Sequence, residues 1–217
     1  MTLEVRKPHY SIADYLAREQ NALDKHEFRD GEILLMAGGT ADHSLVTLNV
    51  GGELRNILKG KPCHVYDSNL RVRIPRTILY TYPDVIVICG PRVFDPNDST
   101  GETVTNPKLI VEVLSPSTEA YDRGEKFARY RLLDSLEEYV LVSLSTPRVE
   151  TFYRAPAPAP TPNTDPASAP AVAERTWLIS TTNGTSASAK LLSLGITLPL
   201  AEVYRGLEFP ASTQAET

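Results

Sequence analysis

The stretch LIVEVL at residues 109–114 constrains the architecture most, because it is apolar at every position except Glu112. A continuous apolar run of this length predicts a strand that is covered on both faces of a sheet. A second run, VIVIC at 85–89, follows Pro83-Asp84 and predicts a neighbouring strand of the same kind. A carboxylate in such an apolar layer is strongly unfavourable unless it is paired, neutralised or bound to a metal. Glu112 therefore indicates either a buried ion pair or a functional site.

Asp84 and Lys126 are expected to lie close to Glu112 in the fold. Two adjacent strands would place Asp84 beside Glu112, and a divalent cation would relieve the repulsion between the two carboxylates. Mg²⁺ (or Mn²⁺) suits such a pair, because Mg²⁺ keeps several waters and needs few protein oxygens. Lys126 lies in the segment DRGEK at 122–126, in a predicted helix that could return its ammonium over the strand end. There it would position an attacking water or stabilise a phosphate transition state, which predicts metal-assisted phosphodiester hydrolysis.

Each of these three residues also has a structural interpretation. A Pro-Asp pair at a strand start is often turn chemistry alone. Glu112 could be the inner partner of Arg71 or Arg73, and Lys126 on an amphipathic helix is most often a solvated side chain. Their order along the chain, at a strand start, in a strand and in the following helix, favours one common site.

The segment LIVEVLSPSTEAYDRGEK at 109–126, together with Pro83-Asp84, resembles the PD-(D/E)xK nuclease superfamily. It is most similar to a bacterial family of restriction-endonuclease-like proteins of uncharacterised function, and the similarity covers about residues 10–153 and 195–204. The resemblance implies an α/β fold, a mixed α+β sheet flanked by helices, with a restriction-endonuclease-like core. It also implies that Asp84, Glu112 and the backbone carbonyl of Val113 are metal ligands. The superfamily signature has a lysine two residues after the glutamate, where this chain has Leu114, so Lys126 is the expected substitute.

Several weaker candidates surround this presumed site. His43 could contact a phosphate or a metal-bound water, but it is equally a residue near a helix cap. Glu27 or Glu32 could complete a metal shell, although both are equally surface charges of a hairpin. Asp122 precedes Lys126 in the same segment, and Tyr121 could stack on a base.

Basic residues gather in two stretches of a chain whose formal net charge is −5. The first comprises Arg55, Lys59, Lys61, His64, Arg71, Arg73 and Arg76, and the second comprises Arg123, Lys126, Arg129 and Arg131. Arg71, Arg73 and Arg123 are the candidates for contact with a nucleic acid, expected to be DNA, although an ordinary solvated surface would look the same. No zinc-finger spacing or helix-turn-helix signature is present, so the sequence does not predict sequence-specific recognition of bases.

Patterns on either side of the two apolar strands predict the remaining elements. Ser11 with Asp14 suits a capping box at a helix start, and Asp122 with Glu125 predicts a second helix running to about residue 134. Asp30-Gly31 suits a tight hairpin turn. A long helix is expected at 41–58, a short one at 200–204, and strands at 63–66, 70–74, 138–143, 148–153, 175–180 and 187–192.

The 217 residues suit one nuclease-like domain at 1–217. Apolar residues make up 41 % and charged residues 23 %, which excludes global disorder. The proline- and alanine-rich segment 155–172 predicts an exposed loop or linker, and 173–209 a C-terminal hairpin and short helix packed on the same domain. The longest apolar runs are too short to span a membrane. Cys63 and Cys89 lie outside any C-x-x-C pair and make no disulfide framework, so a reducing, cytoplasmic setting is expected.

These observations lead to one main hypothesis and two alternatives. The main hypothesis is a metal-dependent endonuclease with Asp84, Glu112 and Lys126 as catalytic residues. The first alternative is a non-catalytic binding or dimerisation module on a nuclease-like scaffold. Independently of the function, the N-terminal hairpin could offer an edge or a swapped surface for a homodimer. The binding module has a structural signature. It predicts a closed pocket with Glu112 tied to an arginine. The second is a hydrolase of small phosphodiesters, which predicts a closed pocket that no basic groove reaches.

Overall fold

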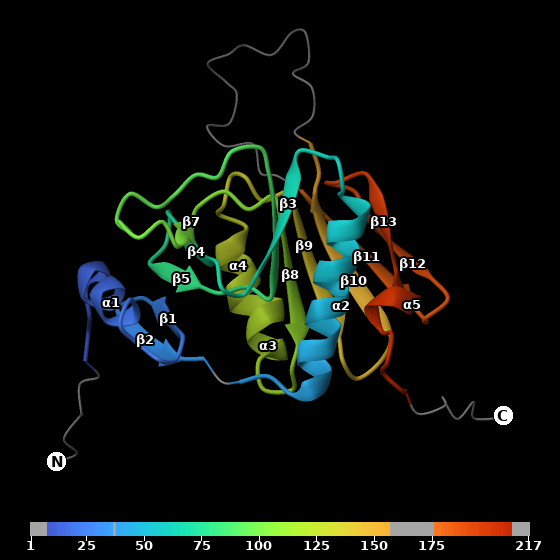
Figure 1. Ribbon diagram of the computed structural model, residues 1–217, viewed down its shortest axis with the longest axis horizontal. Coiled ribbons are helices and arrows are strands. Elements are labelled where there is room, and N and C mark those ends of the chain that lie inside the picture. Colours follow the sequence, from blue (N-terminus) through green and yellow to red (C-terminus); the bar gives the residue numbers. More distant parts are fainter. Residues whose placement is uncertain (1–7, 37, 157–175, 210–217) are drawn as a thin grey trace, which may run out of the picture.

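The apolar runs at 85–89 and 109–114 form adjacent antiparallel strands in the larger of two sheets (Figure 1). The computed structural model describes residues 8–36, 38–156 and 176–209. The larger sheet has the order β11-β10-β9-β8-β6-β3. Its strands are β3 (Cys63–Asp67), β6 (Val85–Cys89), β8 (Leu109–Leu114), β9 (Glu138–Ser143), β10 (Arg148–Arg154) and β11 (Trp177–Asn183).

The smaller sheet has the order β2-β1-β5-β4-β7. It consists of β1 (His26–Arg29), β2 (Glu32–Leu35), β4 (Arg71–Ile74), β5 (Leu79–Thr81) and β7 (Thr103–Val104), while β12 (Ser188–Leu191) and β13 (Ile196–Pro199) form a separate hairpin. The helical elements are α1 (Ile12–Glu19), α2 (Ala41–Ile57), α3 (Glu119–Tyr121), the π-helical turn η1 (Asp122–Lys126), α4 (Phe127–Tyr130) and α5 (Leu200–Val203). Within the described ranges, no helix is both long and apolar enough to cross a bilayer.

The larger sheet is covered on both faces, as its apolar strands predict. Alternate residues of β8 enter two separate cores. Val111 and Val113 face α2, which lies across the front of the sheet in Figure 1, and pack with Val50 of that helix. Ile110 and Leu114 face the opposite side, where α4 and the smaller sheet pack. Side chains alternate along a strand, so Glu112 shares this second face.

Local patterns place the N-terminal elements. The capping box of Ser11 with Asp14 starts α1, as predicted. Asp30 and Gly31 have φ angles of 50° and 90° and join β1 to β2. Two successive residues with positive φ form the primed hairpin turn that the Asp-Gly pair predicts.

The structure corrects several of the predicted elements. The helix after β8 begins at Glu119, so Asp122 lies inside the helical segment and is no N-cap. Strands β5 and β7 are absent from the prediction. The predicted strands around Asn183-Gly184 exist but do not pair with each other, because β11 pairs with β10 and β12 pairs with β13.

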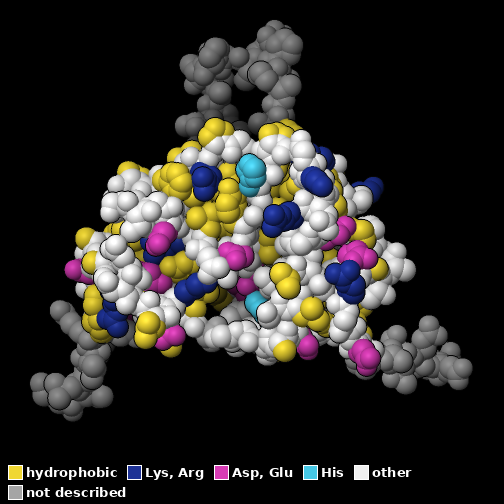
Figure 2. Space-filling view, in the orientation of Figure 1, with side chains coloured by type: hydrophobic (Ala, Val, Ile, Leu, Met, Phe, Trp, Pro, Cys, Tyr) yellow, Lys and Arg dark blue, Asp and Glu magenta, His cyan; other side chains and the backbone are white. Residues whose placement is uncertain are grey.

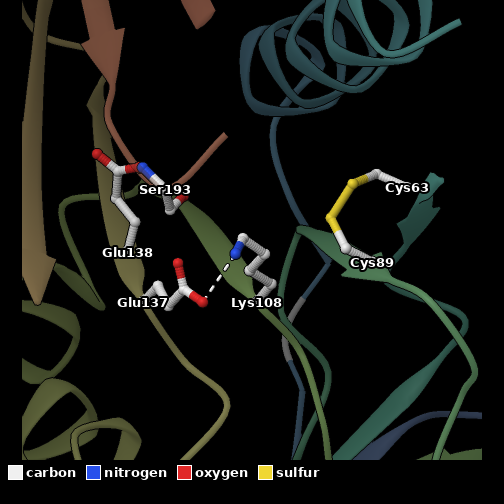
Figure 3. Close-up of a disulfide and its surroundings, with 6 residues drawn as sticks. All are labelled: Cys63, Cys89, Lys108, Glu137, Glu138 and Ser193. Carbon is white, nitrogen blue, oxygen red and sulfur yellow. Dashed lines mark hydrogen bonds and ion pairs between the residues drawn. A yellow bond between two sulfur atoms is a disulfide. The ribbon is translucent and has the colours of Figure 1, made fainter. Parts of the chain in front are cut away.

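Cys63 and Cys89 form a disulfide, so the expectation that the two cysteines do not pair is wrong (Figure 3). The two residues face each other in the register of β3 and β6, so the bond ties the edge strand to its neighbour. A sequence pattern could reveal this pairing only if the adjacency of the two strands were known.

Polar contacts hold the C-terminal elements against the rest of the fold. Figure 3 shows Glu138 at the start of β9 facing Ser193, whose backbone N–H and hydroxyl both donate to its carboxylate. Asn49 of α2 donates to the carbonyl oxygens of Val203 and Arg205, next to α5. Most of the proline-rich segment predicted at 155–172 lies outside the described residues.

Candidate active site

Asp84, the residue before β6, lies opposite Glu112 of the neighbouring strand β8. Val85 pairs with Val111, so the antiparallel register places Asp84 opposite Glu112 at the carboxyl end of β8. Neighbouring strands are about 5 Å apart. The backbone N–H of Val113 donates to Asp84 Oδ2 at 2.7 Å, which fixes the Asp84 carboxylate at this end of the sheet.

Lys126 reaches Glu112 from the helical segment that follows β8. Its Nζ lies 2.8 Å from Glu112 Oε1 and 3.3 Å from Asp122 Oδ1. Both Asp122 and Lys126 belong to the π-helical turn η1, and both are buried. Single π turns within helices are rare and occur frequently at functional sites. The structure thus brings together Asp84, Glu112 and Lys126.

Glu27 joins this group from the smaller sheet. Its carboxylate accepts a hydrogen bond from Thr81 Oγ1 on β5, and its Oε1 lies 3.7 Å from Lys126 Nζ. One ammonium therefore faces Glu112, Asp122 and Glu27. The prediction named Glu27 but missed Thr81, because β5 is a short strand without an apolar repeat of its own.

The environment of Glu112 favours its neutral form. Burial raises the pKa of Glu112 to about 8, the negative charges of Asp122 and Asp84 add to the rise, and Lys126 opposes it. Tyr130 of α4 donates its hydroxyl to Glu112 Oε1 at 2.9 Å. In the described part of the chain Glu112 contacts a lysine and a tyrosine, and Arg71 and Arg73 have other partners.

The environment of Lys126 favours its charged form. Burial alone would lower its pKa, but Glu112, Glu27 and Asp122 raise the pKa of Lys126 well above its ordinary value. At neutral pH the side chain is therefore an ammonium. It can donate hydrogen bonds and attract anions, and it cannot act as a base.

His43 approaches Asp84 from the start of α2. Its Nε2 lies 3.3 Å from Asp84 Oδ2, and the hydrogen bond to that carboxylate raises the pKa of His43 despite partial burial. Thr40 caps the helix by accepting from the His43 backbone N–H. A Cβ at Gly39 would lie 2.9 Å from His43 Nδ1, so a larger residue there would displace the imidazole.

A cleft of about 1000 Å³ opens onto Asp84 and His43 and extends along α2 toward β3. In Figure 2, acidic, basic and histidine side chains surround a hollow near the middle of the face, by the end of β8. Glu112 and Lys126 lie deeper, with 4 % and 6 % of their surface exposed. Of this group, Asp84 and His43 line the cleft, and Glu112 and Lys126 lie behind them.

Two further predicted residues lie around this group. Glu32 is in β2, opposite Arg29 across the hairpin. The Tyr121 ring lies 4.9 Å from the Arg29 guanidinium and 6.0 Å from Lys126 Nζ. Cations therefore already face the Tyr121 ring that was expected to stack on a base.

The three arginines expected to contact nucleic acid are held by carboxylates. The ion pairs are Arg71 with Asp98 at 3.0 Å, Arg73 with Asp95 at 2.6 Å, and Arg123 with Glu119 at 2.7 Å and Glu150 at 2.6 Å. Arg71 is only 3 % exposed, so burial contradicts its predicted role. For Arg73 and Arg123, partners within the fold already neutralise the charge.

The donor set at the end of β8 suits a hard divalent cation. Asp84, Glu112 and the carbonyl of Val113 offer only oxygen atoms, and Mg²⁺ completes its shell with water when few protein ligands are present. Among the described residues, no group of three or more His, Cys, Asp or Glu side chains is arranged to hold a metal ion. A cation here would therefore depend on two carboxylates, a carbonyl and waters.

Comparisons with known proteins give the chain a context. The family model "Uma2: Putative restriction endonuclease" matches residues 12–181. The "Uncharacterized protein slr1290" of Synechocystis sp. is 36 % identical over 202 residues, which are 93 % of this chain and 95 % of that protein. The "Uncharacterized protein sll1609" of the same organism is 38 % identical over 144 residues, 66 % of this chain and 80 % of that protein.

A solved structure has a similar fold. It is described as a putative nuclease belonging to DUF820 from Anabaena variabilis, with a TM-score of 0.62 and 14 % sequence identity. The match covers 88 % of this chain and 94 % of that one. The similarity confirms the predicted mixed fold of restriction-endonuclease type.

Proposed function

Since the chain belongs to the family described as "Putative restriction endonuclease", we propose that it hydrolyses phosphodiester bonds in nucleic acid, with DNA as the expected substrate. The observation that carries the proposal is the cluster of Asp84, Glu112 and Lys126 at one end of β8. It opens to solvent at Asp84, and Glu112 has no arginine partner among the described residues. These features favour a nuclease over the binding module with a closed pocket.

In this proposal Asp84, Glu112 and the Val113 carbonyl would hold Mg²⁺ or Mn²⁺, the ligand set of a PD-(D/E)xK nuclease. Such a cation polarises the phosphate and lowers the pKa of a bound water. Glu112 has to lose its proton to act as a ligand, and the ammonium of Lys126 at 2.8 Å stabilises the resulting carboxylate.

Lys126 would act as a fixed positive charge. Asp122 and Glu27 hold its ammonium in place, so no reorganisation is needed when negative charge develops on the phosphate. Because its pKa is raised, Lys126 would orient the attacking water or stabilise phosphate oxygens and would not remove a proton. His43 beside Asp84 would contact the phosphate from the cleft.

A cleavage assay with matched variants tests the proposal. Wild type, Glu112→Gln and Glu137→Gln would be incubated with duplex DNA, single-stranded DNA and RNA in Mg²⁺, Mn²⁺ or EDTA. Glu137 suits the control because it lies beyond the opposite end of β8 and pairs with Lys108 at the surface (Figure 3). We expect metal-dependent cleavage by wild type and Glu137→Gln, and a loss of at least 100-fold for Glu112→Gln, a typical effect of removing one catalytic group.

Two results would contradict the proposal. Cleavage that survives in Glu112→Gln would mean a contaminating enzyme or a different catalytic carboxylate. The absence of cleavage on every substrate, from wild type with a cooperative unfolding transition, would instead favour a non-catalytic binding or dimerisation module.

A further inference from the structure

The cleft at Asp84 continues along the edge strand β3 into two smaller hollows. A hollow of about 670 Å³ shares Arg55, Val65 and Tyr66 with the cleft. A third hollow, of about 370 Å³, shares His64 and Tyr66 with the second. Within the described part of the chain β3 pairs only with β6 and ends the sheet, so no described strand covers its outer edge along this path.

The register fixes the direction of this path. Asp67, at the end of β3, pairs with Val85, the residue after Asp84. Cys63 at the start of β3 is therefore the far end, and the disulfide to Cys89 ties that end to β6. The five residues of β3 extend over about 16 Å, which matches about five nucleotides along one strand of a duplex.

The charge of the path distinguishes it from the rest of the surface. Among the residues that the structure describes, no Asp or Glu lines either smaller hollow. The cations that line them are all exposed and, within the described ranges, form no ion pair: Arg55, Lys59, Lys61, His64 and Arg92, here called the basic track. In Figure 2, Lys and Arg side chains surround a histidine over β3 and the adjacent end of α2.

Exposed cations that are gathered on one path and form no ion pair create a positive potential, which attracts an anionic partner. By contrast, Arg71, Arg73 and Arg123 are already neutralised inside the fold. We propose that the basic track binds the phosphate backbone of the nucleic acid on one side of the bond held at Asp84. This inference rests on the proposed function and names the surface that would hold its substrate. Contacts to phosphates alone give affinity without choice of sequence.

Binding in EDTA tests the track separately from cleavage. Fluorescence anisotropy would measure the Kd of a labelled duplex and a labelled single strand of about 20 nucleotides over a range of salt. The track variant is Lys59→Ala/Lys61→Ala/Arg92→Ala. The control, Arg18→Ala/Lys190→Ala/Arg205→Ala, removes the same formal charge at exposed positions outside the track.

We expect the track variant to bind at least about tenfold more weakly, and its slope of log K against log salt to fall by about 2–3, since each phosphate contact contributes about 0.9. The control should stay within about twofold of wild type. Equal weakening in both variants would show that net charge alone matters, and unchanged binding by the track variant would also overturn the proposal.

The two proposals can fail separately. If wild type cleaves, and the track variant binds and cleaves as well as wild type, then the proposed role of the basic track in binding phosphates is wrong and the nuclease function stands. If wild type neither binds nor cleaves any nucleic acid, both are wrong. Because all the substituted side chains are exposed, unchanged thermal unfolding should show that both variants fold.

Discussion

Replacing Glu112 with glutamine should remove a loss of stability that wild type shows between acidic and neutral pH. Glu112 is buried, and its pKa is about 8 in the folded chain against an ordinary value of 4.5. Between these values the folded chain binds more protons than the unfolded chain. The stabilising contribution of this carboxyl is therefore complete below pH 4.5 and is lost as the pH rises through 8.

The size of the effect follows from this pKa difference. Proton linkage through Glu112 lowers the free energy of unfolding by about 1 kcal/mol at pH 5 and by about 3 kcal/mol at pH 7. Between these two pH values, wild type should therefore lose about 2 kcal/mol of stability through this residue. Glutamine accepts the hydrogen bonds of Lys126 and Tyr130 but does not titrate. Costs of the substitution that do not depend on pH cancel when each protein is compared with itself at two pH values.

Urea unfolding in EDTA at pH 5 and pH 7 measures this difference. The single tryptophan, Trp177, reports unfolding because its ring packs edge-on against Phe127 at 5.2 Å. Glu137→Gln is the control and should keep the pH dependence of wild type. The reasoning is refuted if Glu112→Gln loses as much stability between pH 5 and pH 7 as wild type does.

Three further predictions concern the disulfide, the lysine and the histidine. Unreduced protein in denaturant should show no reactive thiol, and reduction of Cys63–Cys89, which are 26 residues apart, should lower the free energy of unfolding by about 3 kcal/mol. Two thiols that react before reduction would contradict this. Lys126→Met should cost about 3–5 kcal/mol in urea unfolding, because buried carboxylates lose their cation; an unchanged midpoint would show that the ammonium is dispensable for folding. In an NMR titration of metal-free protein, the pKa of His43 should lie above 6.5 and should fall in Asp84→Asn. Equal values in the two proteins would exclude the contact with Asp84.

Burial on both faces explains why the central strands could be predicted. The runs 85–89 and 109–114 lack alternation because every apolar position in them packs in one of two cores, so the single charged residue, Glu112, stands out. The same reasoning places Asp84 next to Glu112 once the strands are taken as neighbours. The residue order therefore predicts the carboxylate pair only together with the assumption that the two strands are adjacent, which the structure confirms.

Other parts of the site depend on contacts distant in sequence. Glu27 meets Lys126 only because β1 pairs with β5, and the pattern of neither strand predicts that pairing. Strand β7 has two residues and owes its existence to parallel pairing with β4. The sequence does not predict the π turn η1 either, because Asp122 and Glu125 fit the pattern of an ordinary capping box.

The arginines illustrate a different limit of sequence patterns. Composition alone treats Arg55 and Arg71 as equivalent members of one basic stretch. In the fold, Arg71 lies in β4 and meets Asp98 in the interior, whereas Arg55 is exposed on α2 and lines the cleft. The location of the carboxylates decides which cation remains available, and that location is set by tertiary structure.

The position of the lysine can be understood from the pleat of β8. Leu114 stands two residues after Glu112, where the PD-(D/E)xK pattern that the sequence resembles has a lysine, and it shares a face of the strand with Glu112. In this chain α4 packs on that face, and Leu114 and Tyr130 are buried together there. A charged residue at 114 would thus have to enter an apolar core. An ammonium supplied from η1 approaches Glu112 from the covering helical segment, with Asp122 one turn away as a second counter-charge. The proposed site therefore keeps the ammonium of Lys126 beside the buried Glu112, while position 114 carries a leucine that packs in the apolar core.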